Sequence, residues 1–222
     1  MSFFIKNLKM MFNRKIVLTV VVCFAVNVFY SLNNFPEVLL GVKNGFEIYT
    51  AIPWISVIFP FFLGTGAYFA AMEDISTFSF PRIKGVGRYY IYYYLTLIFS
   101  SVVYCLFYGV IAIALGGEII DTLFCVGLLT LNLLFISTIQ CAVYSIKKNT
   151  LLSIGVVLVI ILVSLMFPKP HFNIGAWGML VRSNIKVNYG FSVIIITVIQ
   201  IIFTVIGNIV IAVTNKNKKM LL

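Results

Sequence analysis

Residues 49–72 read YTAIPWISVIFPFFLGTGAYFAAM, a run that contains no Lys, Arg, Asp, Glu or His. An α-helix needs about 20 consecutive apolar residues to cross the hydrocarbon core of a bilayer. The run therefore predicts a transmembrane helix. Pro53 and Pro60 each remove one helical hydrogen bond, and Gly64 and Gly66 follow closely, which predicts a bend or close packing against a neighbour.

Five further runs are equally free of charge. They lie near Ile16–Leu32, Tyr89–Leu115, Thr122–Tyr144, Thr150–Phe167 and Phe191–Val213. The chain as a whole is 62% apolar and only 10% charged, whereas soluble domains average about 25% charged residues. A water-soluble globule is excluded. The sequence predicts an all-α, polytopic membrane protein with six transmembrane helices in one domain that occupies residues 1–222.

The charged residues alternate from one connection to the next. The N-terminus, residues 73–88, residues 145–149 and the C-terminus hold twelve of the 16 Lys and Arg residues: Lys6, Lys9, Arg14, Lys15, Arg82, Lys84, Arg88, Lys147, Lys148, Lys216, Lys218 and Lys219. The alternate connections hold Lys43, Lys169, Arg182 and Lys186, with Glu37, Glu47, Glu118 and Asp121. The positive-inside rule then places both termini in the cytoplasm and explains the net charge of +10 without nucleic acid. The short connections and the absence of a transit-like presequence indicate the plasma membrane of a bacterium.

Residues for catalysis or for metal binding are scarce. The one histidine, His171, has no Asp or Glu within thirty residues, and no G-x-x-x-x-G-K-[ST] or H-E-x-x-H motif is present. Cys23, Cys105, Cys125 and Cys141 fall inside predicted spans without a C-x-x-C spacing and read as small apolar core residues. We expect no enzyme, no catalytic residue, no metal and no cofactor in this chain.

The same scarcity bears on energy coupling. Carriers driven by ion gradients usually keep an ionisable group at membrane depth, and these spans keep none. Any active transport would therefore take its energy from a partner. The polar residues within spans are Asn27, Asn132, Ser137, Thr138, Gln140, Gln200 and Asn208, which we expect to hydrogen-bond between helices rather than to form a substrate site.

The N-terminus carries an amphipathic pattern. Phe4, Ile5, Leu8, Met11 and Phe12 recur at helical spacing, and the other side carries Lys6, Lys9 and Asn13. Such a helix is typical of one that lies along the inner membrane surface and contacts lipid. A basic leader that only orients the first span is the alternative reading.

Residues 73–88 form the longest predicted cytoplasmic connection, and they carry Glu73 and Asp74 first and Arg82, Lys84 and Arg88 last. Asp74 or Ser76 could cap a short helix that Pro81 and two glycines end, and the tyrosines at 89–94 would anchor the next span at the interface. Residues 73–88 could dock to a cytoplasmic partner, or they could be an ordinary charged loop, and the sequence favours neither reading.

This layout resembles the membrane subunits of ABC-2 type ABC exporters, including small permeases beside bacteriocin-immunity and peptide-export ATPases. The resemblance rests on the helix at Phe3–Phe12, the six spans, the acidic end of the second span at Glu73 and the connection with Arg82, Gly85 and Arg88. It also includes the semi-apolar stretch Phe172–Leu180, which resembles the re-entrant helices that such permeases place before the sixth span.

The resemblance implies a permease that works with a second copy or a homologous permease and with two separate ABC ATPase subunits. The connection at Glu73, Asp74, Arg82, Lys84 and Arg88 would couple to the ATPase, and ATP would be bound only by that partner. Three alternatives remain: a non-transporting immunity or scaffold protein, an intramembrane enzyme, and the substrate-binding subunit of an energy-coupling-factor importer, whose A-x-x-x-A motif is missing from the first span.

Overall fold

The computed structural model describes residues 2–31, 35–42, 48–79, 86–166, 178–179 and 191–220, with side chains at 5–27, 35–42, 51–72, 91–166, 178–179, 197–211 and 213. None of the residues in these ranges forms a strand. The predicted all-α class is therefore confirmed. The helices are α1 (Ser2–Met11), α2 (Arg14–Ser31), α3 (Phe35–Leu40), α4 (Ile48–Ser79), α5 (Val86–Ala114), α6 (Ile119–Lys147), α7 (Thr150–Met166) and α8 (Phe191–Met220).

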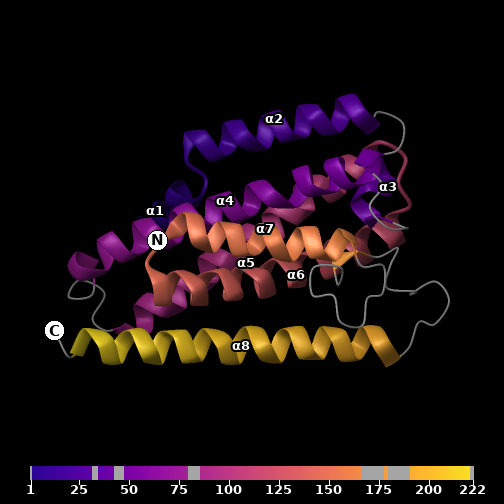
Figure 1. Cartoon of the computed structure of the whole chain (residues 1–222). Helices are drawn as coiled ribbons and strands as arrows, with labels where there is room; N and C mark the ends of the chain where they lie inside the picture. The colour runs from indigo at the N-terminus through magenta and orange to yellow at the C-terminus, as the bar shows by residue number, and fades with distance from the viewer. Residues whose placement is uncertain are drawn as a thin grey trace.

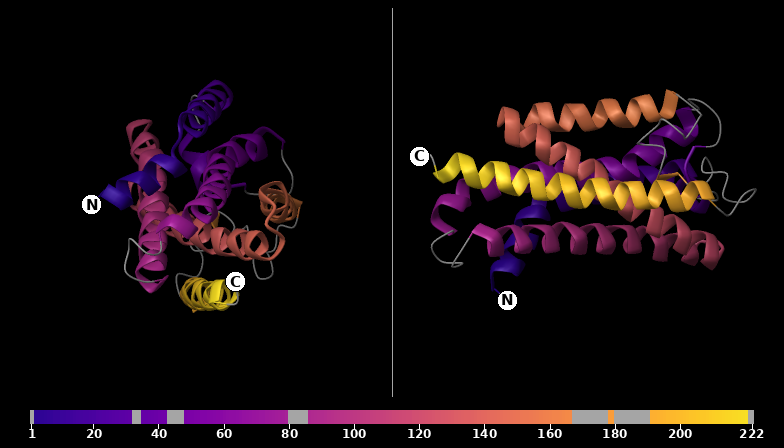
Figure 2. Two further views of the ribbon diagram at one scale, coloured as in Figure 1. Left: turned by 90° about the vertical axis from the view of Figure 1, so that its left-hand side faces the viewer. Right: turned by 90° about the horizontal axis from the view of Figure 1, so that it is seen from below.

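The six longer helices lie lengthwise in one bundle, and each of the six apolar runs coincides with one of them (Figure 1). Helix α2 packs along α4, and α8 packs along α6. Seen along the bundle, α2 and α8 lie on opposite sides (Figure 2). The short helices α1 and α3 lie near opposite ends of the bundle.

Among the described residues, three helical segments are long and apolar enough to cross a membrane: Ala51–Met72, Ile91–Ala114 and Ile119–Lys147. The pair Ile5–Met11 and Arg14–Asn27, bent by 54°, makes a fourth when it is counted as one span. Helix α7 and the segment Thr197–Ile211 are shorter apolar helices. Several long apolar helices of this kind characterise a protein embedded in a membrane.

The outer surface of the bundle is apolar. Leu18 on α2, Val110 on α5 and Leu151 on α7 are 66%, 65% and 82% exposed. Soluble monomers rarely expose large contiguous apolar patches, because water disfavours them. Lipid tails have no such preference, so this surface fits a hydrocarbon environment.

Local signals explain where several helices begin. The side-chain Oδ1 of Asn13 accepts a hydrogen bond from the Ile16 amide at 3.0 Å, and Asn149 Oδ1 accepts one from the Leu152 amide at 3.1 Å. Each asparagine thus satisfies an amide of the first helical turn that has no partner within the helix. These two caps begin α2 and α7.

Glycine ends α5. Gly116 has φ +94°, and its amide donates to the Ile113 carbonyl while the Gly117 amide donates to the Ala112 carbonyl. This pair of bonds is the Schellman pattern, which needs a left-handed residue that glycine adopts without a steric penalty. The chain therefore reverses within four residues before α6 begins.

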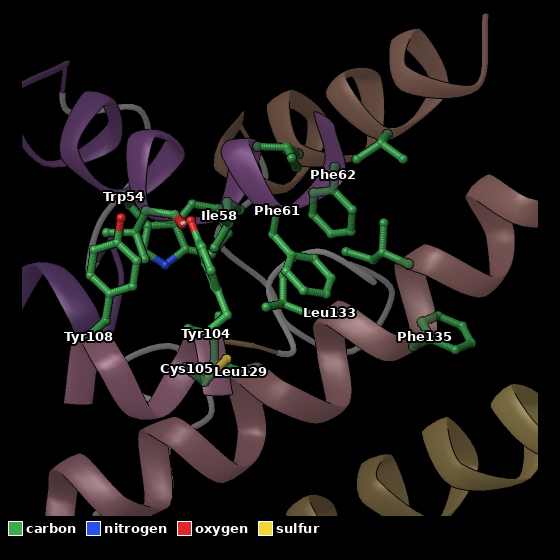
Figure 3. Close-up of a cluster of buried hydrophobic side chains, with 14 of the residues drawn as sticks. Trp54, Ile58, Phe61, Phe62, Tyr104, Cys105, Tyr108, Leu129, Leu133 and Phe135 are labelled. Atoms are coloured by element: carbon green, nitrogen blue, oxygen red, sulfur yellow. Dashed lines mark hydrogen bonds between the residues drawn. The ribbon is translucent and has the colours of Figure 1, made fainter. Parts of the chain in front are cut away.

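Aromatic side chains fill the contact between α4 and α5 (Figure 3). The Tyr104 ring lies 5.3 Å from the Phe61 ring and 5.2 Å from the Tyr108 ring, centre to centre. The Tyr104 hydroxyl donates to the Val57 carbonyl at 2.6 Å, so its polar end is satisfied inside the bundle. Trp54 is also buried in this cluster.

Two glycines of α4 allow the close packing that the sequence predicted. A Cβ at Gly64 would lie 3.1 Å from the Met11 carbonyl oxygen of α1, and one at Gly66 would lie 3.1 Å from Gln140 Nε2 of α6. Helix α4 runs without interruption through Pro53 and Pro60. Small residues let helix backbones approach where lipid supplies no hydrophobic drive for association.

The structure corrects the boundaries of the predicted connection at 73–88. Residues 73–79 continue α4, and 86–88 begin α5, so Asp74 and Ser76 lie within a long helix rather than at the start of a short one. The physical reason is that no proline or glycine occurs between Met72 and Ser79, whereas Pro81 disfavours helical backbone at the residue before it.

Helix α3 was not predicted, because residues 33–48 were interpreted as an external connection. Phe35 and Leu39 are buried, and the Cys125 thiol of α6 donates to the Leu39 carbonyl at 2.9 Å. Six residues form too short a pattern to reveal a helix on their own. Packing against α6 stabilises α3.

The contact between α5 and α6 gives a test of this packing. A Cβ at Gly109 would lie 2.6 Å from Val126 Cγ2, and a valine side chain has little rotamer freedom in a helix. We expect Gly109→Ala to lower the free energy of unfolding by about 1–3 kcal/mol, measured by thermal unfolding in detergent. Gly127→Ala is the matched control, since a Cβ there meets nothing within 4 Å. Equal losses in both variants would contradict the assigned packing.

Candidate functional site

A polar contact joins α4 and α6 inside the bundle. Gln140 Nε2 donates to the Phe62 carbonyl at 3.0 Å, and the Thr65 hydroxyl donates to Gln140 Oε1 at 2.6 Å. The side chains of Gln140 and Thr65 are fully buried. Hydrogen bonds of this kind between membrane helices average about 0.6 kcal/mol. The contact serves helix association, as the sequence predicted for Gln140.

A second polar contact holds α8 against α6. Gln200 Nε2 donates to Asn132 Oδ1 at 3.4 Å, and both side chains are buried. Gly178 lies beside them, because a Cβ there would be 2.7 Å from Asn132 Nδ2. Two turns later, a Cβ at Gly207 would lie 2.8 Å from the Thr138 methyl group. The contacts at Gln200 and at Gly207 therefore hold α8 against α6 at two positions along the helix.

A cavity of about 360 Å³ opens where α5, α6 and α8 face one another. Its lining comprises Tyr94, Leu97, Ile98, Leu131, Leu134, Thr138, Ile201, Thr204, Val205, Asn208 and Ile209. Most of these side chains are aliphatic. Ligand sites in proteins span about 300–1,000 Å³ and are mostly apolar with a few polar groups, and this cavity fits that description.

Four neutral polar residues interrupt the apolar lining. The Tyr94 hydroxyl donates to the backbone carbonyl of Asn208 at 2.8 Å, and the Thr138 hydroxyl donates to its own helix at Leu134. The buried Oδ1 atom of Asn208 has no hydrogen-bond partner among the described residues. Together with Thr204, this amide oxygen leaves the cavity able to accept a hydrogen bond from a mainly apolar ligand.

Among the described lining residues, the one titratable side chain is that of Tyr94. Within the described ranges, no group of three or more His, Cys, Asp or Glu residues could hold a metal ion. Cys105, Cys125 and Cys141 are buried and form no disulfide, which confirms the prediction that they are core residues. Cys23 is partly exposed. His171 lies outside the described residues.

Of the predicted coupling residues, the structure describes the backbone of Glu73, Asp74 and Arg88 but not their side chains. Glu73 and Asp74 lie in the C-terminal part of α4, and Arg88 lies in the first turn of α5. Both helix ends lie at the end of the bundle where α1 is found (Figure 1). Arg82 and Lys84 lie outside the described residues.

Residues Ser2–Met11 form a helix, α1, but the predicted apolar face of this helix does not point one way. Met11 is fully buried against α4, Leu8 and Phe12 are half-buried, and Ile5 is 44% exposed. The side chain of Phe4 lies outside the described residues. Asn7 was assigned to neither face, yet it is fully buried, and its Nδ2 lies 3.5 Å from the Thr96 hydroxyl of α5.

Sequence reasoning did not foresee the packing of two tyrosines. Tyr93 and Tyr94 were predicted to anchor α5 at the membrane interface, but Tyr93 is buried and Tyr94 lines the cavity. The sequence of α5 does contain a pattern that indicates which side chains are buried. The buried residues Tyr93, Leu97, Ser100, Tyr104 and Tyr108 recur at three- and four-residue spacing, which is the pattern of one buried helix face.

Of the stretch Phe172–Leu180, the structure describes Gly178 and Met179. Both are buried, and Met179 packs against Gly41, where a Cβ would lie 2.6 Å from Met179 Cβ. The resemblance to re-entrant helices rests on the remaining residues, which lie outside the described ranges. Comparison of this chain with protein-family models, curated proteins and solved structures found no match.

Proposed function

We propose that this chain is a membrane-spanning permease subunit of an ATP-driven ABC exporter of the ABC-2 type. The cavity between α5, α6 and α8 carries the proposal, since it offers an apolar site with neutral hydrogen-bonding groups at the depth of long apolar helices. Such a lining suits an apolar or amphipathic substrate. A second permease copy or a homologous permease would complete the pathway.

In this proposal α2 and α4 to α8 are six spans. At 1.5 Å per residue, the 17 residues of α7 extend about 26 Å and the 32 residues of α4 extend about 48 Å. A tilted or thinned bilayer accommodates such differences around its thickness of about 30 Å. The C-terminal part of α4 would then project beyond the hydrocarbon core.

The distribution of charge supports an orientation with both termini in the cytoplasm. One end of the bundle carries Lys6, Lys9, Arg14, Lys15, Lys147 and Lys148, all exposed. The other end carries exposed Glu37 and Glu118 and half-exposed Asp121. The positive-inside rule assigns the basic end to the cytoplasm of a bacterial cell. Helix α1 would lie at the inner membrane surface.

The energy source in this proposal is a separate ATPase. The sequence has no phosphate-binding loop, and its apolar runs hold no acid, base or histidine. An ATPase below the membrane would contact the C-terminal end of α4 and the N-terminal end of α5, which carry Glu73, Asp74 and Arg88.

Charge reversal at this end tests the coupling. We expect Arg88→Glu and Glu73→Arg to lower stimulation of the ATPase in the reconstituted complex by about tenfold or more, because reversing a docked charge weakens an interface strongly. The measurement is phosphate release with and without the permease, after co-purification of the ATPase with the tagged chain from its native membranes.

Glu118→Arg is the matched control, because Glu118 is exposed at the opposite end of the bundle. It should leave stimulation unchanged. Full stimulation in both test variants would reduce this segment to an ordinary connection. Failure of any ATPase to co-purify would favour the reading as an immunity or scaffold protein.

A further inference from the structure

A second cavity, of about 310 Å³, lies between α1 and α5. Its lining comprises Ile5, Leu8, Lys9, Phe12, Phe99, Ser100 and Val103. Phe99, Val103 and Ile5 are 48%, 44% and 44% exposed, so the groove opens onto the apolar outer surface of the bundle. We call it the α1–α5 groove.

Two polar groups interrupt the apolar walls of the groove. Ser100 is fully buried, yet its hydroxyl has no hydrogen-bond partner among the described residues. Lys9 lines the groove and is exposed, so its ammonium group reaches solvent. A buried hydroxyl without a partner costs about 1–3 kcal/mol, which a bound acceptor would recover.

The charge around the groove selects the kind of ligand. Helix α1 contains Lys6 and Lys9 and no acidic residue, and Arg14 and Lys15 follow directly at the start of α2. All four basic side chains are exposed. The complementary molecule has an apolar chain, an ester or hydroxyl oxygen and a negative head group.

We propose that the α1–α5 groove binds one anionic phospholipid, with an acyl chain against Phe99 and Val103, an oxygen of the glycerol region at Ser100 and the phosphate at Lys9. The bound lipid would join α1 to α5, where Asn7 and Thr96 make a polar contact at 3.5 Å. This site does not depend on the proposed transport function, and no ATPase is needed to test it.

The test measures lipid binding to the purified full-length chain. Dioleoylphosphatidylglycerol is titrated in detergent, retained lipid is counted by native mass spectrometry, and dioleoylphosphatidylcholine with the same acyl chains is the neutral comparison. We expect one tightly retained phosphatidylglycerol per chain. Lys9→Gln should weaken its binding about fivefold, since one basic side chain near an anionic lipid contributes about that factor.

Lys147→Gln is the charge-matched control, because Lys147 is exposed at the same end of the bundle but outside the groove. It should leave phosphatidylglycerol binding unchanged. Equal weakening by both lysine variants, or equal retention of the two lipids, would overturn the proposal in favour of a general attraction to a basic surface.

A second pair of variants tests the acyl-chain position without changing charge. Val103→Trp fills the groove, whereas Val102→Trp places the same side chain on the neighbouring exposed position outside it. We expect the first to remove the retained lipid and the second to keep it. Retention in both variants would show that the groove is not the site. Displacement of the lipid by millimolar inorganic phosphate alone would show that the groove binds a free anion rather than a lipid.

Discussion

Reconstituted alone in liposomes, this chain should neither hydrolyse ATP nor accumulate solute in response to a proton or sodium gradient. The apolar runs hold no side chain that titrates near neutral pH, and no phosphate-binding loop occurs in the sequence. A proton-coupled carrier needs a group that binds and releases the proton at membrane depth. The expected rates are therefore those of empty liposomes.

Addition of the ATPase partner should produce ATP hydrolysis and transport of the substrate. Phosphate release measures hydrolysis, and quenching of a pH-sensitive dye measures any proton-coupled flux. Gradient-driven uptake by the isolated chain would overturn the exporter proposal. It would direct attention to the neutral amides Asn27, Asn132, Gln140, Gln200 and Asn208, which coordinate ions without titrating a proton.

The structure already assigns three of these amides to contacts within the bundle. Gln140 bonds to α4, and Gln200 bonds to Asn132 between α8 and α6. Gln140 and Asn132 would have to break a contact to coordinate a cation, because their amide oxygens accept hydrogen bonds from Thr65 and Gln200. The amide oxygens of Gln200 and Asn208 are both buried without a partner among the described residues, and of these two residues Asn208 lines the cavity.

The long apolar helices were predictable because they depend on a local property. A stretch such as residues 49–72 has no charge over more than the thickness of a bilayer, and only a helix satisfies every backbone amide and carbonyl there. The helical caps at Asn13 and Asn149 are equally local, since each bonds an amide three residues later. No knowledge of the other helices is needed for either feature.

The cavity was not predictable, because it depends on contacts between helices that are far apart in the sequence. Gly207 approaches Thr138, and the Asn208 carbonyl accepts from Tyr94, so residues of three helices must be placed together before any space is defined. Tyrosine favours the interface in general, but Tyr93 is buried in the bundle and the half-buried Tyr94 lines the cavity.

Cysteine labelling in intact cells should distinguish the two ends of the bundle, with labelling at one end and none at the other. We expect a cysteine introduced at Glu118 to react with a membrane-impermeant maleimide from outside, and cysteines at Asn149 and at Lys147 to react only after permeabilisation. A cysteine at Asn44, which lies outside the described residues, should also react from outside, because the sequence predicts an external connection there. The exposed basic residues Lys6, Lys9, Arg14, Lys15, Lys147 and Lys148 lie at the second of these ends, which the positive-inside rule places in the cytoplasm.

The background for this labelling is low, because Cys105, Cys125 and Cys141 are buried, and Cys23→Ala removes the remaining partly exposed thiol. Asn149 caps α7 through its bond to the Leu152 amide, so its replacement costs about 0.5–2 kcal/mol of helix stability. Lys147 is exposed and makes no such cap, and the two sites must therefore agree before either is interpreted.

Labelling of Lys147→Cys and Asn149→Cys from outside, with protection of Glu118→Cys, would invert the orientation. It would place α1, the C-terminal end of α4 and the N-terminal end of α5 on the outer face, beyond the reach of a cytoplasmic ATPase.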